Sequence, residues 1–96
     1  MPARRIPRAF TLPWGSGLVL EEAAIEGGLH APSIQLLHYE LGDRKGQMAI
    51  RFAAYDEHGH VEQRPLMVNE REFAALRAEI ERSPRLRALL RRLVED

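Results

Sequence analysis

Val68-Asn69-Glu70-Arg71-Glu72-Phe73 is the stretch that decides the fold, because it is a complete start signal for a helix. Asn69 can cap the free amides of the first turn, and Glu72, three residues later, can reach back to close a capping box. Val68 and Phe73 stand at the two positions of a hydrophobic staple, which fixes how the chain enters the helix. The six residues therefore predict a switch from sheet to helix at Asn69.

The segments before this signal alternate between apolar and polar residues, as strands do. Residues 33–41 and 47–55 are the clearest of them. Residues 61–68 form a further strand, where Pro65 has no N–H to donate and so predicts an edge or a bulge. Residues 18–25 fit a helix stripe about as well as a strand, and we favour a strand.

The alternation in residues 47–55 also predicts which face of the sheet is buried. The apolar set consists of Met48, Ile50, Phe52 and Ala54. It alternates with a mixed set that consists of Ala49, Arg51, Ala53 and Tyr55. Because burial favours apolar side chains, we expect the first set to form the core. The opposite face is then exposed, covered by the N-terminal segment, or used for binding.

A helical pattern follows Glu70, with Phe73, Leu76 and Ile80 on one stripe. Ser83-Pro84 interrupts it, since a serine followed by a proline is itself a start signal, so a second or kinked helix continues to about residue 94. We therefore expect an α+β fold, in which an antiparallel meander of three to four strands precedes a C-terminal helix. That helix must cover one face of the sheet to bury its stripe.

The length of 96 residues predicts a single domain at 18–96, preceded by a basic arm at 1–17 that is rich in proline and glycine. There is no cysteine, which excludes a disulfide framework and a thiol nucleophile and fits a reducing compartment. No apolar run approaches the roughly 18 residues of a membrane span. The start of the chain also lacks the apolar region of a secretory signal. We therefore expect a cytoplasmic protein.

The formal net charge is zero, but the charges are unevenly distributed. Residues 9–43 contain acidic residues and no lysine or arginine, whereas residues 82–92 contain five arginines and no acid. Such asymmetry gives a neutral protein a local basic surface, or simply a solvated helix face.

Residues 47–90 resemble the single-stranded-DNA-binding domain of transcriptional positive cofactor four, which is similar in architecture to the Whirly proteins. The likeness is carried by Ile50-Arg51, Tyr55, Asp56, Gly59, Leu66-Met67-Val68 and the helix start at Asn69. It implies a curved four-stranded sheet, a C-terminal helix and a homodimer that binds single strands across its sheets. The sequence also resembles small bacterial proteins of unassigned function.

Single-strand binding needs cations that follow the phosphates and flat rings on which bases stack. The resemblance carries over Arg51 by position, and Tyr55 approximately. The candidate nucleic-acid-binding residues are Arg44, Lys45, Arg51, Tyr55, Arg64 and Tyr39. The chain departs from the family before the last strand, where residues 62–65 contain a single cation, Arg64. Most of the lysines that stud the family's sheet are also missing.

Ordinary packing gives a different account of the same residues. Arg51 would pair with a cross-strand acid such as Glu40, and Tyr39 and Tyr55 would be half-buried. Zero net charge also disfavours tight nonspecific binding of nucleic acid. The alternative function is a protein-interaction module that uses the sheet edge, the aromatic N-terminal arm and the leucine-rich C-terminal helix.

Catalytic and metal-binding motifs do not stand out. His58 and His60 could supply two ligands, but a metal site needs at least one or two more. The few hydroxyls lie in expected loops or a cap, without a positioned base. We therefore expect a non-catalytic binding protein without metal or cofactor, which forms a homodimer and has single-stranded nucleic acid as its leading ligand.

Overall fold

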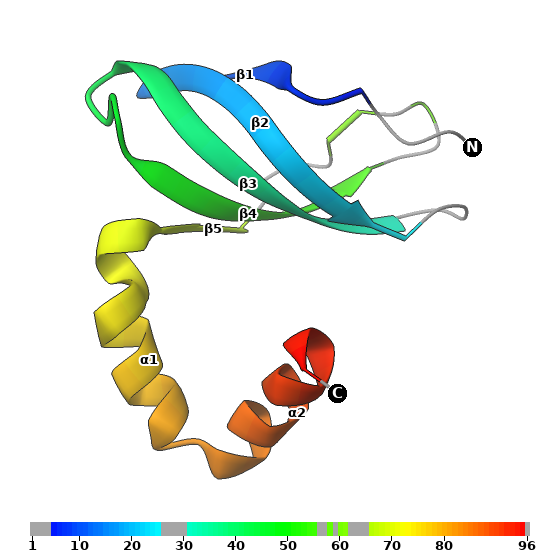
Figure 1. Cartoon of the computed structure of the whole chain (residues 1–96), viewed down its shortest axis with the longest axis vertical. Coiled ribbons are helices and arrows are strands. Elements are labelled where there is room, and N and C mark those ends of the chain that lie inside the picture. Colours follow the sequence, from blue (N-terminus) through cyan, green and yellow to red (C-terminus); the bar gives the residue numbers. More distant parts are fainter. Residues whose placement is uncertain (1–4, 26–30, 56–57, 59, 62–65, 96) are drawn as a thin grey trace.

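The computed structural model describes residues 5–25, 31–55, 58, 60–61 and 66–95. Its strands form one antiparallel sheet in the order β1-β2-β3-β4-β5, so each strand pairs with the next along the chain (Figure 1). The strands are β1 (Arg8–Leu12), β2 (Gly15–Ala24), β3 (Ala31–Gly42), β4 (Met48–Tyr55) and β5 (Leu66–Asn69). The predicted α+β meander is confirmed, with five strands rather than three to four.

The helices follow the sheet directly. They comprise the single 3-10 turn η1 (Glu70–Glu72), α1 (Phe73–Glu81) and α2 (Pro84–Val94). The predicted start at Asn69 is confirmed, because the helical region begins at Glu70 and Glu72 accepts hydrogen bonds from the backbone N–H and the side-chain amide of Asn69, both at 2.9 Å. The predicted cap on the first-turn amides is not formed, since Oδ1 of Asn69 has no hydrogen-bond partner among the described residues. The predicted break is also confirmed, since Ser83 precedes α2 and Pro84 occupies its first turn.

The N-terminal segment differs from the expected arm, because residues 8–12 and 15–17 belong to β1 and β2. Proline residues flank β1, and their presence concealed its alternation of Arg8, Phe10 and Leu12. These three side chains lie opposite β2 at Val19, Gly17 and Gly15. The ambiguous segment 18–25 is strand up to Ala24, as we favoured.

The last predicted strand, residues 61–68, lies only partly within the described residues. Val61 forms an isolated bridge with Tyr55, and the regular strand β5 begins at Leu66. β5 is an edge strand, but the prediction for Pro65 lies outside the described residues.

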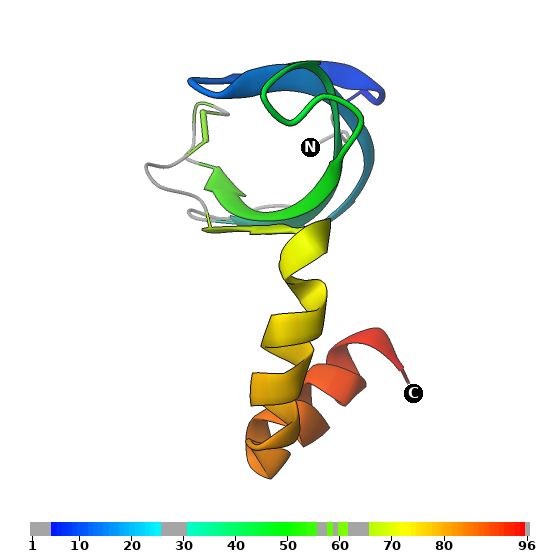
Figure 2. The ribbon, with the colours of Figure 1, turned by 90° about the vertical axis from the view of Figure 1, so that its left-hand side faces the viewer.

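The sheet is strongly curved, and β2, β3 and β4 wrap around its concave side (Figure 2). Register shifts between β2 and β3 at Ser16/Gly17 and Val19/Glu21 contribute to this bend, because bulges increase local twist. Gly17 permits the closest approach, since a Cβ there would lie 2.0 Å from the carbonyl oxygen of His38. Gly42 (φ 98°) and Gly46 (φ 85°) supply the left-handed conformations of the β3–β4 turn.

The core lies on the concave face, and the predicted core face of β4 is therefore wrong. The buried residues of β4 are Ala49, Arg51, Ala53 and Tyr55, whereas Phe52 on the other face is 39% exposed. Curvature and β1 close the concave side. On the convex side, Met48, Ile50 and Ala54 are half-buried and Phe52 is exposed.

The expectation that the helix covers the sheet is also wrong. α1 leaves β5 and stands away from the convex face, and α2 turns back beside it without lying on the sheet (Figures 1 and 2). No residue of α1 or α2 is buried. The radius of gyration is 14.5 Å, whereas a compact domain of this length has about 12.5 Å.

None of the described helices has the length and apolar content that crossing a membrane would require.

Candidate functional site

The concave face is divided into an apolar end and a polar end. The apolar end consists of Phe10, Val19, Leu37, Tyr39 and Ala49, with Leu12 and Met67 packed against it. Phe10 and Tyr39 meet edge to face, with ring centroids 5.3 Å apart, and the indole N–H of Trp14 donates to the Tyr39 hydroxyl at 3.0 Å. This arrangement is an ordinary aromatic core.

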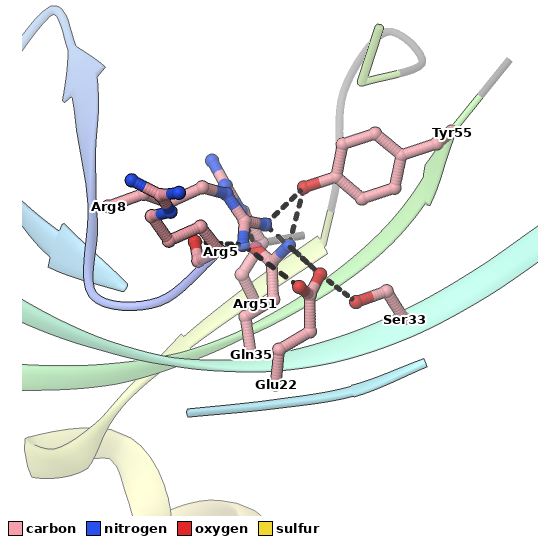
Figure 3. A network of polar contacts seen from close by, with 7 residues as sticks. All are labelled: Arg5, Arg8, Glu22, Ser33, Gln35, Arg51 and Tyr55. Carbon is pink, nitrogen blue, oxygen red and sulfur yellow. Dashed lines mark hydrogen bonds and ion pairs between the residues drawn. The ribbon is translucent and has the colours of Figure 1, made fainter. Parts of the chain in front are cut away.

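The polar end is centred on the carboxylate of Glu22, which reaches from β2 toward β1 and β3 (Figure 3). Arg8 donates to it through both terminal nitrogens, at 2.9 and 3.1 Å. Ser33 and Gln35 donate to the same carboxylate at 2.6 and 2.8 Å. A bidentate arginine and two neutral donors therefore compensate a charge whose side chain is only 6% exposed.

Gln35 connects this carboxylate to β4. Its amide nitrogen donates to Glu22 and to the hydroxyl of Tyr55, and its oxygen accepts from Nε of Arg51 at 2.6 Å. The Tyr55 hydroxyl also accepts from Arg8 at 3.1 Å. Four consecutive strands are thus joined by one network, in which both donors and the acceptor of the Gln35 amide are used.

The network also sets the ionisation of Glu22. Burial alone would raise the pKa of Glu22, but the hydrogen bonds from Arg8, Ser33 and Gln35 and the charge of Arg8 lower it to about 2. Glu22 is therefore ionised throughout the neutral range, and its carboxylate is held by its neighbours.

The residues predicted to bind nucleic acid are not brought together on one exposed surface. Tyr39 and Tyr55 are buried in the concave face, as is Arg51, which pairs with Gln35 rather than with Glu40. The guanidinium carbon of Arg51 lies 6.0 Å from the centroid of the Phe10 ring. The other three residues are Arg44 and Lys45 in the β3–β4 turn, half-buried and exposed respectively, and Arg64, which lies outside the described residues.

Sequence reasoning missed the four other members of the network, which are Arg8, Glu22, Ser33 and Gln35. The available signal was the period of two in β3, which places Ser33 and Gln35 on the same face as Leu37 and Tyr39. The partners in β1 and β2 are separated by a turn and a bulge, so their spacing in the sequence does not reveal the contact.

The convex face forms the second notable surface, an apolar groove of about 700 Å³ between the sheet and α1. The groove is lined by Ile50, Phe52, Val68, Phe73, Ala74, Leu76, Arg77, Ala78, Ile80 and Glu81. Two strands supply its floor and α1 supplies its wall. Both residues of the predicted staple, Val68 and Phe73, belong to this lining.

The groove is exposed and almost uncharged. Phe73 and Leu76, which a covered helix would bury, are 40% and 44% exposed. The two charged side chains of the lining, Arg77 and Glu81, lie 3.7 Å apart as an ion pair. A pocket of this size with an apolar lining is suited to apolar side chains of a ligand.

α2 presents a further apolar surface beside the groove. Its large apolar side chains are Leu86, Leu89, Leu90, Leu93 and Val94, and all five are exposed. Contiguous apolar surface of this kind marks interaction sites in soluble proteins.

Among the described residues, no group of three or more histidine or acidic side chains is placed to hold a metal ion. No protein-family model, curated protein or solved structure matches the chain. The resemblance to the positive cofactor four domain therefore stays a prediction.

Proposed function

We propose that this chain is a non-catalytic protein-interaction module whose convex groove receives an amphipathic helix. The observation that supports this function is the groove itself, in which Phe52, Phe73 and Leu76 remain exposed between a sheet and a helix. Helix-in-groove recognition uses this chemistry, because the apolar face of a helix supplies the side chains that such a groove lacks.

A protein ligand fits the geometry better than single-stranded nucleic acid does. Phosphate recognition depends on cations that can approach the backbone, and base stacking depends on exposed rings. The cation of the groove, Arg77, is already paired with Glu81, while Tyr39, Arg51 and Tyr55 are buried on the opposite face. Nucleic-acid binding therefore stays a prediction from the sequence.

The state of Glu22 does not suit acid–base catalysis by this residue. A general base works best when its pKa lies near the working pH. The pKa of Glu22 is lowered to about 2, and its carboxylate accepts from Arg8, Ser33 and Gln35. The carboxylate of Glu22 joins β2 to β1 and β3 through these hydrogen bonds.

The proposal is tested by the reactivity of a thiol in the groove, since the native chain has no cysteine. Ala78→Cys places the thiol in the groove lining, and Ala75→Cys places it elsewhere on α1 as a matched control. Alkylation is measured over a range of protein concentrations, with and without a leucine-rich amphipathic helical peptide. An occupied groove slows alkylation of the Ala78→Cys thiol at least about tenfold relative to the control.

Equal alkylation of the two thiols under every condition contradicts the proposal. Binding of single-stranded nucleic acid, the alternative ligand, is measured by titration with a labelled oligonucleotide at two salt concentrations. Binding that weakens steeply with salt, together with equal thiol reactivity, would favour the nucleic-acid hypothesis instead.

A further inference from the structure

We infer that the helix that fills the groove is α2 of a second copy of this chain, so that two chains exchange their C-terminal helices reciprocally. This inference rests on the proposed function and names the partner of the same groove.

The first support is the pattern of α2. Leu86, Leu89, Leu90 and Leu93 recur at i, i+3, i+4 and i+7, which places them on one stripe of a helix. The four arginines of α2, at positions 85, 87, 91 and 92, fall on the remaining surface. α2 is therefore the kind of helix that the groove is suited to receive.

The second support is that α2 does not fill the groove of its own chain. It contributes no residue to the groove lining, and its stripe remains exposed, with Leu93 at 61%. Helices of 9 and 11 residues are too short to be stable in water on their own. Both therefore need to pack their apolar side chains against another part of a protein.

The third support is the amount of surface left open. The chain exposes 7469 Å² of accessible surface, whereas a compact monomer of 11.0 kDa exposes about 5,600 Å². A standard interface removes about 800 Å² from each partner, so the excess of about 1,900 Å² is sufficient for a stable dimer. A reciprocal exchange uses the helix–groove contact twice, as two-fold symmetry requires.

The fourth support is charge complementarity. α2 contains four arginines and no acid, while Glu21 and Glu40 are exposed on β2 and β3. Alternation along these strands places both acids on the convex side, opposite to the buried neighbours Glu22 and Tyr39. Glu40 already lies 3.1 Å from Nδ1 of His38, so Glu21 is the acid that remains for an arginine of a second copy, and opposite charges on the two surfaces favour their approach.

A second copy fits better than a foreign protein because both halves of the contact occur in every chain. A foreign partner would have to supply both a helix for the groove and an apolar surface for α2. Exchange between two copies covers both surfaces at once.

The experiment is a complementation test that uses two exposed positions. Leu93→Glu damages the helix, Leu76→Glu damages the groove, and Leu41→Glu, at an exposed position at the end of β3, is the matched control. Molar mass is measured by analytical ultracentrifugation at about 10 μM, a concentration at which a Kd below that value gives mostly dimer. Circular dichroism establishes that each variant is folded.

The native chain and Leu41→Glu should sediment as dimers, whereas Leu93→Glu and Leu76→Glu alone should each associate about 100-fold more weakly. An equimolar mixture of these two variants should recover dimers, because each mixed pair keeps one intact helix and one intact groove. A native monomer, or a mixture without recovery, overturns the exchange. If the native chain is monomeric but a helical peptide still protects the Ala78→Cys thiol, the exchange fails while the proposed function stands.

Discussion

The two faces of the curved sheet differ in whether a single chain completes them. On the concave face, buried polar groups find partners, and the Gln35 amide alone makes three hydrogen bonds to Glu22, Tyr55 and Arg51. On the convex face, the apolar side chains face a groove, and the helices that could cover it stand apart. The difference indicates that the concave face maintains the fold, whereas the convex face keeps apolar surface exposed within one chain.

Among substitutions on the two faces, Glu22→Ala should lower the free energy of unfolding the most. The change leaves Arg8, Ser33 and Gln35 without a shared acceptor inside the sheet, and removal of one member of a buried ion pair is costly. We expect the free energy of unfolding to fall by about 3 kcal/mol in urea titrations. Glu21→Ala, one residue away on the exposed side, should change it by less than about 0.5 kcal/mol. Equal effects would show that the two faces do not differ in this way.

Low pH should lower the free energy of unfolding over a defined pH range, because it protonates Glu22 on the concave face. The folded pKa of Glu22 is about 2, below the ordinary value of 4.5, so its contribution is fully present above about pH 4.5 and is lost as pH falls toward 2. The loss amounts to about 3 kcal/mol, measured as the free energy of unfolding at successive pH values. Glu22→Gln should remove this part of the pH dependence. A native profile that matches that of Glu22→Gln would contradict the assignment.

Two tyrosine hydroxyls provide a finer contrast within the concave face. Tyr55→Phe removes an acceptor for both Arg8 and Gln35, and should cost about 1–2 kcal/mol in thermal or urea unfolding. Tyr39→Phe removes the partner of Trp14, whose side chain is partly exposed to water, and should cost less than about 1 kcal/mol. The opposite order would mean that the polar network is not the stronger of the two.

The smallest expected effect lies at Asn69, where the chain passes from the sheet to the helices. Asn69→Ala removes the amide that donates to Glu72, and should destabilise the protein by about 0.5–1 kcal/mol. The matched control is Ser83→Ala, because the Ser83 hydroxyl donates a long hydrogen bond of 3.3 Å to the carbonyl oxygen of Glu79. An unchanged melting temperature for Asn69→Ala would show that the hydrogen bond from Asn69 to Glu72 does not secure the helix start.

Local patterns in the sequence predict most of the elements. The strands β3 and β4, the start of the helical region at Asn69 and its break at Ser83-Pro84 all follow from alternation, capping and proline chemistry. These features depend on residues within a few positions of each other, so the sequence displays them directly.

The buried face of the sheet is the feature that the sequence predicts wrongly. In β4, hydrophobicity favours Ile50 and Phe52, yet the fold buries Arg51 and Tyr55. The reasons are the bend of the sheet and the direction in which α1 leaves it, both of which depend on distant residues. Arg51 can be buried because Gln35 accepts from it, and that pairing joins residues in different strands.

The measurement that tests the central claim most directly is the molar mass of the native chain in solution, combined with hydrogen exchange of α1 and α2. If the convex face is completed by a second copy, the mass is twice 11.0 kDa and the amides of both helices lose their protection on dilution to monomer. A mass of a single chain with both helices still protected would contradict it, because the helices would then be stable with their apolar faces uncovered.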